Sequence, residues 1–189
     1  MRMLSPVLAL LATVLVIPAP ALAQQIDIVA LGDSNTFGLW AGRRNAFPAL
    51  IENSLRTGGY DVRVTNRGIS GDTTGGMLRR LDRAVPRSTE IAIVQGGYND
   101  GRRGVQPRTR DANVEEILKR LRARGVKTVL CGLSGADWAG IARRQGAVLV
   151  PPSTCYDANN RGFDRLHMNR AGHRVVAARL LPVIERLLR

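Results

Sequence analysis

Ser34, Asp164 and His167 have the side chains that together can turn a serine hydroxyl into a nucleophile. A hydroxyl reacts only weakly unless a nearby base takes its proton. The chain has two histidines, and we interpret the other one, His173, as structural. Asp164 lies three residues before His167, so its carboxylate can accept the imidazole Nδ1–H within one turn. The spacing predicts acyl chemistry with Ser34 as nucleophile, His167 as base and Asp164 as the orienting acid.

This chemistry also needs hydrogen-bond donors for the oxyanion that forms when the hydroxyl attacks a carbonyl group. Clusters of glycine and polar residues follow the apolar runs of the sequence and contain suitable groups. The candidate donors are the backbone N–H groups of Ser34 and Gly71 and the side-chain amide of Asn99. These three residues are therefore the expected oxyanion hole.

Each candidate also fits an ordinary structural role. Asp33, Ser34 and Asn35 follow a strand and are residue types that commonly cap the next helix. Gly71 and Asn99 are residue types that form turns. Asp164 and His167 could be a surface pair at the start of a helix. No single motif decides between these interpretations, but the order of the motifs and their common position after strands favour the catalytic one.

The elements that must position these residues are short apolar runs alternating with longer amphipathic stretches. Aliphatic and β-branched residues predict five strands, at residues 26–31, 62–65, 91–95, 128–132 and 147–150. Helical periodicity is found in residues 47–55, 114–121 and 171–188. This alternation predicts an α/β fold, a three-layer α/β/α sandwich around a five-stranded, mainly parallel sheet. Such sheets bind ligands at the carboxyl ends of their strands, where the candidate residues fall.

Four of these clusters, in this order, resemble the motif blocks of the SGNH (GDSL-type) hydrolase family of esterases and lipases. Gly32-Asp33-Ser34 is similar to the first block, and Ser70-Gly71-Asp72-Thr73 to the second. Gly97-Tyr98-Asn99-Asp100 is similar to the third block, and Asp164-Arg165-Leu166-His167 to the last. The resemblance spans essentially the whole chain after residue 23. It implies a flavodoxin-like SGNH hydrolase fold and the catalytic and oxyanion roles given above.

Within that family the chain is most similar to exported bacterial thioesterase, arylesterase and lysophospholipase enzymes, on residues 69–73 and 99–107. The likeness implies a serine esterase that cleaves carboxylic ester or thioester bonds of a small ester or lipid through an acyl-Ser34 intermediate. The sequence departs from the family at Leu39-Trp40-Ala41-Gly42, where a short hydrophobic turn is expected. Two alternatives stay open: a carbohydrate O-acetyl esterase using the same residues, and a non-catalytic basic protein that binds the cell envelope.

Residues 1–23 have the pattern of a signal peptide. Arg2 provides a positive start, residues 4–17 are mainly apolar, and Ala21-Leu22-Ala23 fits the small-x-small cleavage rule. An uncleaved anchor is the alternative, although the apolar run is short for a membrane span. Cleavage near Ala23 would leave residues 24–189 as a single hydrolase domain, exported to the periplasm or secreted.

The formal net charge of +13 directs attention to anionic partners. Aromatic residues make up only 4% of the chain and no base-reading motif is present, so nucleic acid is not an expected partner. Most of the charge is expected to be a solvated arginine surface. The arginines that follow strand ends could steer acidic substrates or contact an anionic envelope surface; they are Arg43, Arg44, Arg67, Arg102 and Arg103. We expect a monomer.

The two cysteines, Cys131 and Cys155, fall at neighbouring strand ends in this topology. In an oxidising compartment they could form a disulfide, and the alternative is one buried and one exposed thiol. No set of His, Cys and carboxylate residues has the spacing of a metal site. Residues 32–38 lack the phosphate-loop and dinucleotide-binding patterns. No cofactor is expected.

Overall fold

The computed structural model describes residues 25–189 and contains a five-stranded sheet in the order β2-β1-β3-β4-β5. The strands are β1 (Ile26–Gly32), β2 (Val62–Gly68), β3 (Thr89–Gln95), β4 (Lys127–Cys131) and β5 (Val148–Val150). All four pairs of neighbouring strands run parallel. The five predicted strands are confirmed, and the largest difference is that β2 continues to Gly68, beyond its predicted end at residue 65.

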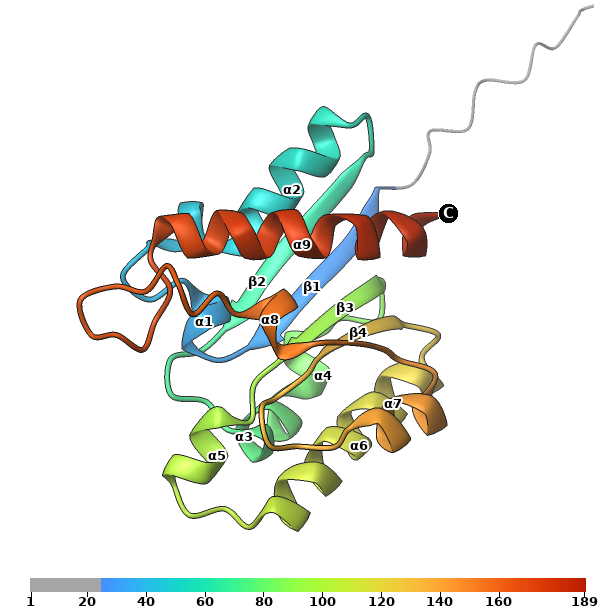
Figure 1. Cartoon of the computed structure of the whole chain (residues 1–189). Coiled ribbons are helices and arrows are strands. Elements are labelled where there is room, and N and C mark those ends of the chain that lie inside the picture. Colours follow the sequence, from blue (N-terminus) through green and yellow to red (C-terminus); the bar gives the residue numbers. More distant parts are fainter. Residues whose placement is uncertain (1–24) are drawn as a thin grey trace, which may run out of the picture.

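Helices lie on both sides of the sheet, which confirms the three-layer α/β/α sandwich (Figure 1). In chain order they are α1 (Ser34–Phe37), η1 (Arg43–Asn45), α2 (Phe47–Thr57), α3 (Thr74–Arg79), α4 (Leu81–Ala84), α5 (Tyr98–Arg102), α6 (Pro107–Ala123), α7 (Ala139–Gln145), α8 (Pro152–Cys155) and α9 (Arg170–Leu188). The three helices that periodicity predicts correspond to α2, α6 and α9. The helices that periodicity does not indicate are short, because one or two turns show no 3.6-residue pattern.

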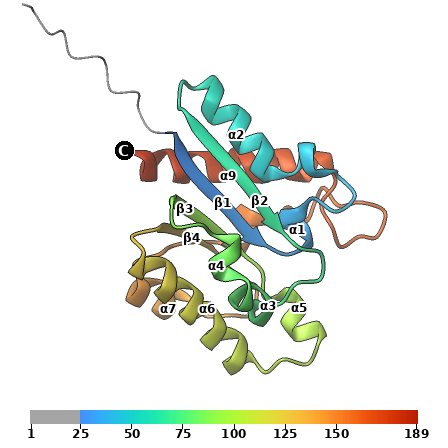
Figure 2. The ribbon, with the colours of Figure 1, turned by 180° about the vertical axis from the view of Figure 1, so that it is seen from behind.

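Each face of the sheet has its own hydrophobic core. Successive side chains of a strand point to opposite faces, so Ile28 packs with α2 and α9, whereas Val29 packs with α3, α4, α6 and α7. Figure 2, which views the molecule from behind, shows the second group of helices. Burial on both faces explains the apolar runs of the central strands β1 and β3, whereas the edge strand β2 also contains exposed polar residues. Parallel pairing also brings the carboxyl ends of all five strands to one edge of the sheet.

A disulfide joins Cys131, the last residue of β4, to Cys155, the last residue of α8, with 5.8 Å between the Cα atoms. Both residues are buried in the core that α2 and α9 cover. The bridge therefore fixes the segment after β5 against the carboxyl end of β4.

No helix within residues 25–189 is long and apolar enough to cross a membrane. The predicted signal peptide, residues 1–23, lies outside the described residues.

His173 is fully buried in α9, against the start of α2. Its Nδ1 accepts a hydrogen bond from the backbone N–H of Phe47 at 3.3 Å, and its ring stacks on the Phe47 ring. Its Nε2 has no hydrogen-bond partner among the described residues. Burial lowers the pKa of His173 to about 4, so the ring is neutral at neutral pH.

The buried His173 should make the folded protein lose stability as the pH falls from about 6.5 toward 4. Its pKa is lower in the folded than in the unfolded chain, so the unfolded chain binds a proton over this range that the folded chain does not. The contribution of the neutral His173 ring to the free energy of unfolding is fully present above pH 6.5. Below pH 6.5 it falls by up to about 1.4 kcal/mol per pH unit. Urea unfolding of the wild type and His173→Gln across this range measures the effect. Parallel pH profiles for the two proteins would contradict it.

Candidate active site

The three residues predicted to form a nucleophile, a base and an acid lie in one hydrogen-bonded chain. Ser34 Oγ is 2.9 Å from His167 Nε2, and His167 Nδ1 is 2.5 Å from Asp164 Oδ2. Ser34 begins α1 immediately after β1, and the other two residues lie in the loop before α9. The fold thus joins groups that are 133 residues apart in the sequence.

The helix cap at Ser34 is provided by its neighbour. Asp33 accepts a hydrogen bond from the backbone N–H of Asn35 at 2.9 Å, so capping does not require the Ser34 hydroxyl. Asp33 is 2% exposed, and its burial raises the pKa of its carboxyl to about 6, although the hydrogen bond from Asn35 opposes this shift. The capping interpretation is therefore realised by Asp33, and the Ser34 hydroxyl is left for His167.

The carboxylate of Asp164 is held by four hydrogen bonds. Its Oδ1 accepts the backbone N–H groups of Leu166 and His167, both at 3.0 Å. Its Oδ2 contacts His167 Nδ1 and accepts the indole N–H of Trp40 at 2.8 Å. These bonds, chiefly that with the His167 ring, hold the pKa of Asp164 well below its usual range. A charged Asp164 keeps the His167 proton on Nδ1, so Nε2 can accept the proton of Ser34.

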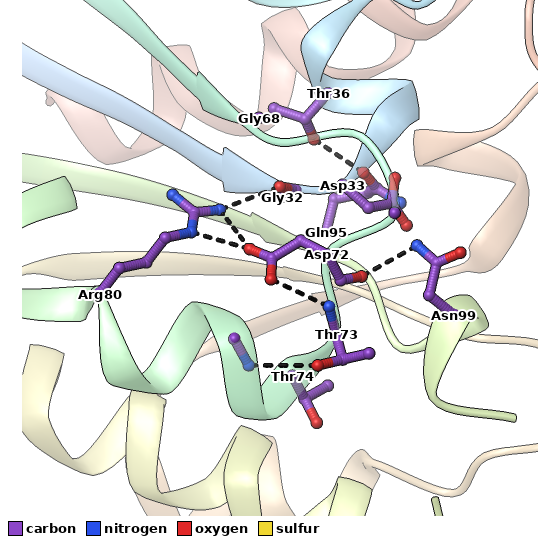
Figure 3. A network of polar contacts seen from close by, with 12 residues as sticks. Gly32, Asp33, Thr36, Gly68, Asp72, Thr73, Thr74, Arg80, Gln95 and Asn99 are labelled. Atoms are coloured by element: carbon purple, nitrogen blue, oxygen red, sulfur yellow. Dashed lines mark hydrogen bonds and ion pairs between the residues drawn. The ribbon is translucent and has the colours of Figure 1, made fainter. Parts of the chain in front are cut away.

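Gly71 and Asn99 are the other two expected oxyanion donors. Gly71 lies in the loop that follows β2, and Asn99 lies in α5, the short helix that follows β3. Gly71 has φ +76°, a left-handed conformation that glycine adopts without strain. Asn99 Nδ2 donates to the backbone oxygen of Asp72 at 2.9 Å, so its amide is tied to the residue after Gly71 (Figure 3). That bond uses one of the two amide hydrogens and leaves the other for a ligand.

A buried ion pair connects these loops to the strand that precedes Ser34. Arg80 Nε donates to Asp72 Oδ2 at 2.8 Å, and one terminal nitrogen lies 2.7 Å from the same oxygen. That nitrogen also donates to the backbone oxygen of Gly32 at 3.1 Å (Figure 3). Both charged side chains are only 10% exposed. The pair and Asn99 together link the carboxyl ends of β1, β2 and β3.

Asp100 makes a second connection between the loops and is fully buried. Its carboxylate accepts the backbone N–H of Thr74 at 2.9 Å and the Thr74 hydroxyl at 2.5 Å. Asp100 therefore fixes α5, which carries Asn99, to the start of α3. Asp100 belongs to the third motif cluster of the sequence, but its contact with Thr74, 26 residues away, has no local sequence signal.

A cavity of about 460 Å³ opens beside the Ser34–His167 contact. Its wall includes Asp33 and Asn35, which flank Ser34, and Leu166, which precedes His167. The remaining lining residues include apolar side chains and two arginines, Arg161 and Arg165. Within residues 25–189, no group of three or more His, Cys, Asp or Glu side chains is arranged to hold a metal ion. The cavity has the size for a small organic molecule and is lined by the chain neighbours of Ser34 and His167.

A parallel α/β sandwich with a hydrogen-bonded serine, histidine and aspartate at its strand ends has the class of site that serine hydrolases use. A model of the GDSL-like Lipase/Acylhydrolase family matches residues 30–175, a segment that contains all four motif clusters. The chain belongs to this family.

Individual relatives agree with this family. Esterase TesA of Pseudomonas aeruginosa is 34% identical over 107 residues, which cover 56% of this chain and 53% of TesA. The arylesterase of Vibrio mimicus is 33% identical over 104 residues, which cover 54% of this chain and 52% of the arylesterase. The chain thus spans about half the length of the curated relatives it matches.

Solved structures confirm the fold over a larger part of the chain. A crystal structure of TesA matches with a TM-score of 0.75 and 24% identity, over 85% of this chain and 99% of TesA. AlinE4, an SGNH-hydrolase family esterase, matches with a TM-score of 0.66 and 27% identity, over 89% of this chain and all of AlinE4. The expected SGNH hydrolase fold is confirmed.

Replacing Arg80 with Met should lower both stability and turnover. The substitution leaves the Asp72 carboxylate buried without its partner, which costs about 3 kcal/mol of unfolding free energy. It also frees the Gly32 and Asp72 backbones, and small misplacements of catalytic groups lower kcat by roughly tenfold to a hundredfold. Urea unfolding and ester hydrolysis measure the two effects. The matched control is Arg79→Met, at the exposed arginine that precedes Arg80 and ends α3, and an equal loss in this control would contradict the role of Arg80.

Proposed function

We propose that the protein is a serine esterase that hydrolyses carboxylic ester or thioester bonds through an acyl-Ser34 intermediate. The observation that carries the proposal is the hydrogen-bonded chain from Ser34 through His167 to Asp164, beside a cavity of about 460 Å³. The names of two relatives, an esterase and an arylesterase, support the same class of reaction.

In the first half of the reaction, Ser34 Oγ attacks the carbonyl carbon while His167 Nε2 takes the hydroxyl proton. The tetrahedral intermediate then collapses, the bond to the leaving alcohol or thiol breaks, and His167 donates the proton to that group. In the second half, water attacks the acyl-Ser34 ester with His167 again as base. The carboxylic acid leaves, Ser34 regains its proton, and no redox step or external cofactor is needed.

The negative charge on the carbonyl oxygen would be held by three donors in this proposal. They are the backbone N–H groups of Ser34 and Gly71 and the free amide hydrogen of Asn99. The bond from Asn99 to the Asp72 backbone supports the assignment, because it orients the amide before substrate arrives. Donors that are already oriented avoid the reorganisation that solvent would need during the reaction.

We further propose that the protein acts after export, in the periplasm or outside the cell. The pattern of residues 1–23 supports export, and so does the Cys131–Cys155 disulfide. Disulfides persist in oxidising compartments and are rare in the cytosol of ordinary bacteria.

Ser34→Ala should abolish hydrolysis of p-nitrophenyl esters, with a loss of at least about a thousandfold in kcat. The wild type, but not this variant, should be labelled by a fluorophosphonate probe, because the probe reacts only with an activated serine. Circular dichroism of both proteins establishes that the fold is intact. Ser54→Ala, at an exposed serine of α2, is the matched control and should keep full activity. Turnover or labelling that persists in Ser34→Ala would refute the proposal.

Asn99→Ala should reduce kcat by about a hundredfold to a thousandfold and change KM much less, because an oxyanion donor acts mainly in the transition state. Steady-state kinetics on one soluble ester gives the two parameters. Asn53→Ala, at an exposed asparagine of α2, is the control. A rise in KM with kcat unchanged would assign Asn99 to substrate binding instead.

A further inference from the structure

Two loops beside the active site place aromatic side chains in solvent. One loop, residues 38–46, follows α1, and the other, residues 156–169, precedes α9; they lie side by side (Figure 1). Trp40 on the first loop is 57% exposed, and Phe163 on the second is 79% exposed. The two ring centroids are 4.8 Å apart, so the rings form one apolar patch, which we call the aromatic tip.

Exposed arginines surround the aromatic tip. Arg43 and Arg44 follow Trp40 in the first loop, and Arg161 and Arg165 flank Phe163 in the second. None of these four makes an ion pair with a carboxylate in the described part of the chain. Arg43 packs on the Phe37 ring, and Arg161 donates to the backbone oxygen of Arg165, but neither contact neutralises a charge. The four positive charges can therefore attract an anionic partner.

The aromatic tip is also connected to the active site. The Trp40 indole N–H donates to Asp164 Oδ2, and Phe163 immediately precedes Asp164. Arg161 and Arg165 line the cavity that lies beside Ser34. A partner that covers the tip would thus lie next to the cavity.

We propose that the aromatic tip and its four arginines dock the protein on an anionic lipid bilayer. Tryptophan and other aromatic rings favour the level of the lipid headgroups, and arginines near an anionic surface add attraction. A soluble polyanion would pair with the arginines but leave both rings in water. A second copy of this chain would bring two positively charged surfaces together, which repel.

Docking rests on the proposed esterase in one respect: it would bring ester bonds of the bilayer or of lipids dissolved in it to the cavity. Binding itself needs no hydrolysis, so it can be measured with the Ser34→Ala variant. Failure of docking and failure of the esterase are then separate results.

The intrinsic tryptophan fluorescence of the protein can be used to measure docking. Its two tryptophans are Trp40 and Trp138, and Trp138 is only 2% exposed. We expect the fluorescence of Ser34→Ala to shift to shorter wavelength on vesicles of phosphatidylglycerol and phosphatidylcholine, and to be quenched by brominated acyl chains. Vesicles of phosphatidylcholine alone should cause a much smaller wavelength shift and much less quenching. Added salt should weaken the binding to anionic vesicles.

Matched variants in the Ser34→Ala background test the residues involved. Phe163→Ser should weaken vesicle binding roughly tenfold, since an apolar ring no longer leaves water. Arg161→Gln and Arg165→Gln should each weaken it about fivefold. The controls are Val148→Ser, an exposed apolar residue at the amino end of β5, and Arg87→Gln, an exposed arginine before β3. Both residues lie toward the edge of the sheet formed by the amino ends of the strands. The two control variants should therefore bind vesicles as tightly as Ser34→Ala does.

Three results would overturn docking. One is no quenching on anionic vesicles, or equal quenching on neutral ones. Another is an equal loss of binding in the control variants. The last is binding to soluble polyglutamate as tight as binding to vesicles, which would assign the arginines to a soluble polyanion. If any of these occurs while the wild type still hydrolyses p-nitrophenyl esters, the esterase stands and docking is refuted.

Discussion

The buried ion pair between Asp72 and Arg80 is the interaction on which the geometry of the site depends. A parallel sheet brings the carboxyl ends of its strands to one edge. This pairing alone does not fix the positions of the loops that follow the strands. Arg80 bonds both Asp72 and the Gly32 backbone, and Asn99 bonds the Asp72 backbone. Because an unpaired charge in this largely buried position would be strongly destabilising, the pairing of Asp72 with Arg80 favours the arrangement of the loops that is observed.

Glycine allows the helix that carries Ser34 to sit directly on the sheet. A Cβ atom at Gly68 would lie 2.1 Å from the backbone nitrogen of Phe37, so β2 and α1 can approach this closely only without a side chain there. The Thr36 hydroxyl then donates to the Gln95 side chain at 2.7 Å and fixes α1 to β3. Ser34 is therefore supported from both neighbouring strands. The loop with His167 is held by bonds within itself, by Trp40, and by the Asn35 side chain, which accepts the backbone N–H of Met168 at 3.3 Å.

The sequence indicates the fold and the main site residues well, because the central strands contain runs of buried aliphatic residues and the motif clusters follow the strands in order. It does not identify Arg80 or Trp40, whose contacts with Gly32 and Asp164 span 48 and 124 residues. No local pattern reports such distant pairs. Trp40 also has φ +68°, a backbone conformation that residue type does not predict. Of the three residues that the sequence offers as caps for α1, Asp33 makes the capping hydrogen bond, and the Ser34 hydroxyl contacts His167 instead.

The basic residues of this chain lie in several different environments rather than in one. Only Lys119 and Lys127 of its 28 basic residues are lysines. The guanidinium group is planar, has five donors and is weakly hydrated, so one residue type can serve in very different places. Arg80 is buried with a carboxylate, and Arg103 donates to the Gly71 backbone at 2.9 Å. The same weak hydration suits the exposed arginines beside the aromatic tip to a lipid surface, where a cation must lose part of its water while an aromatic ring leaves water altogether.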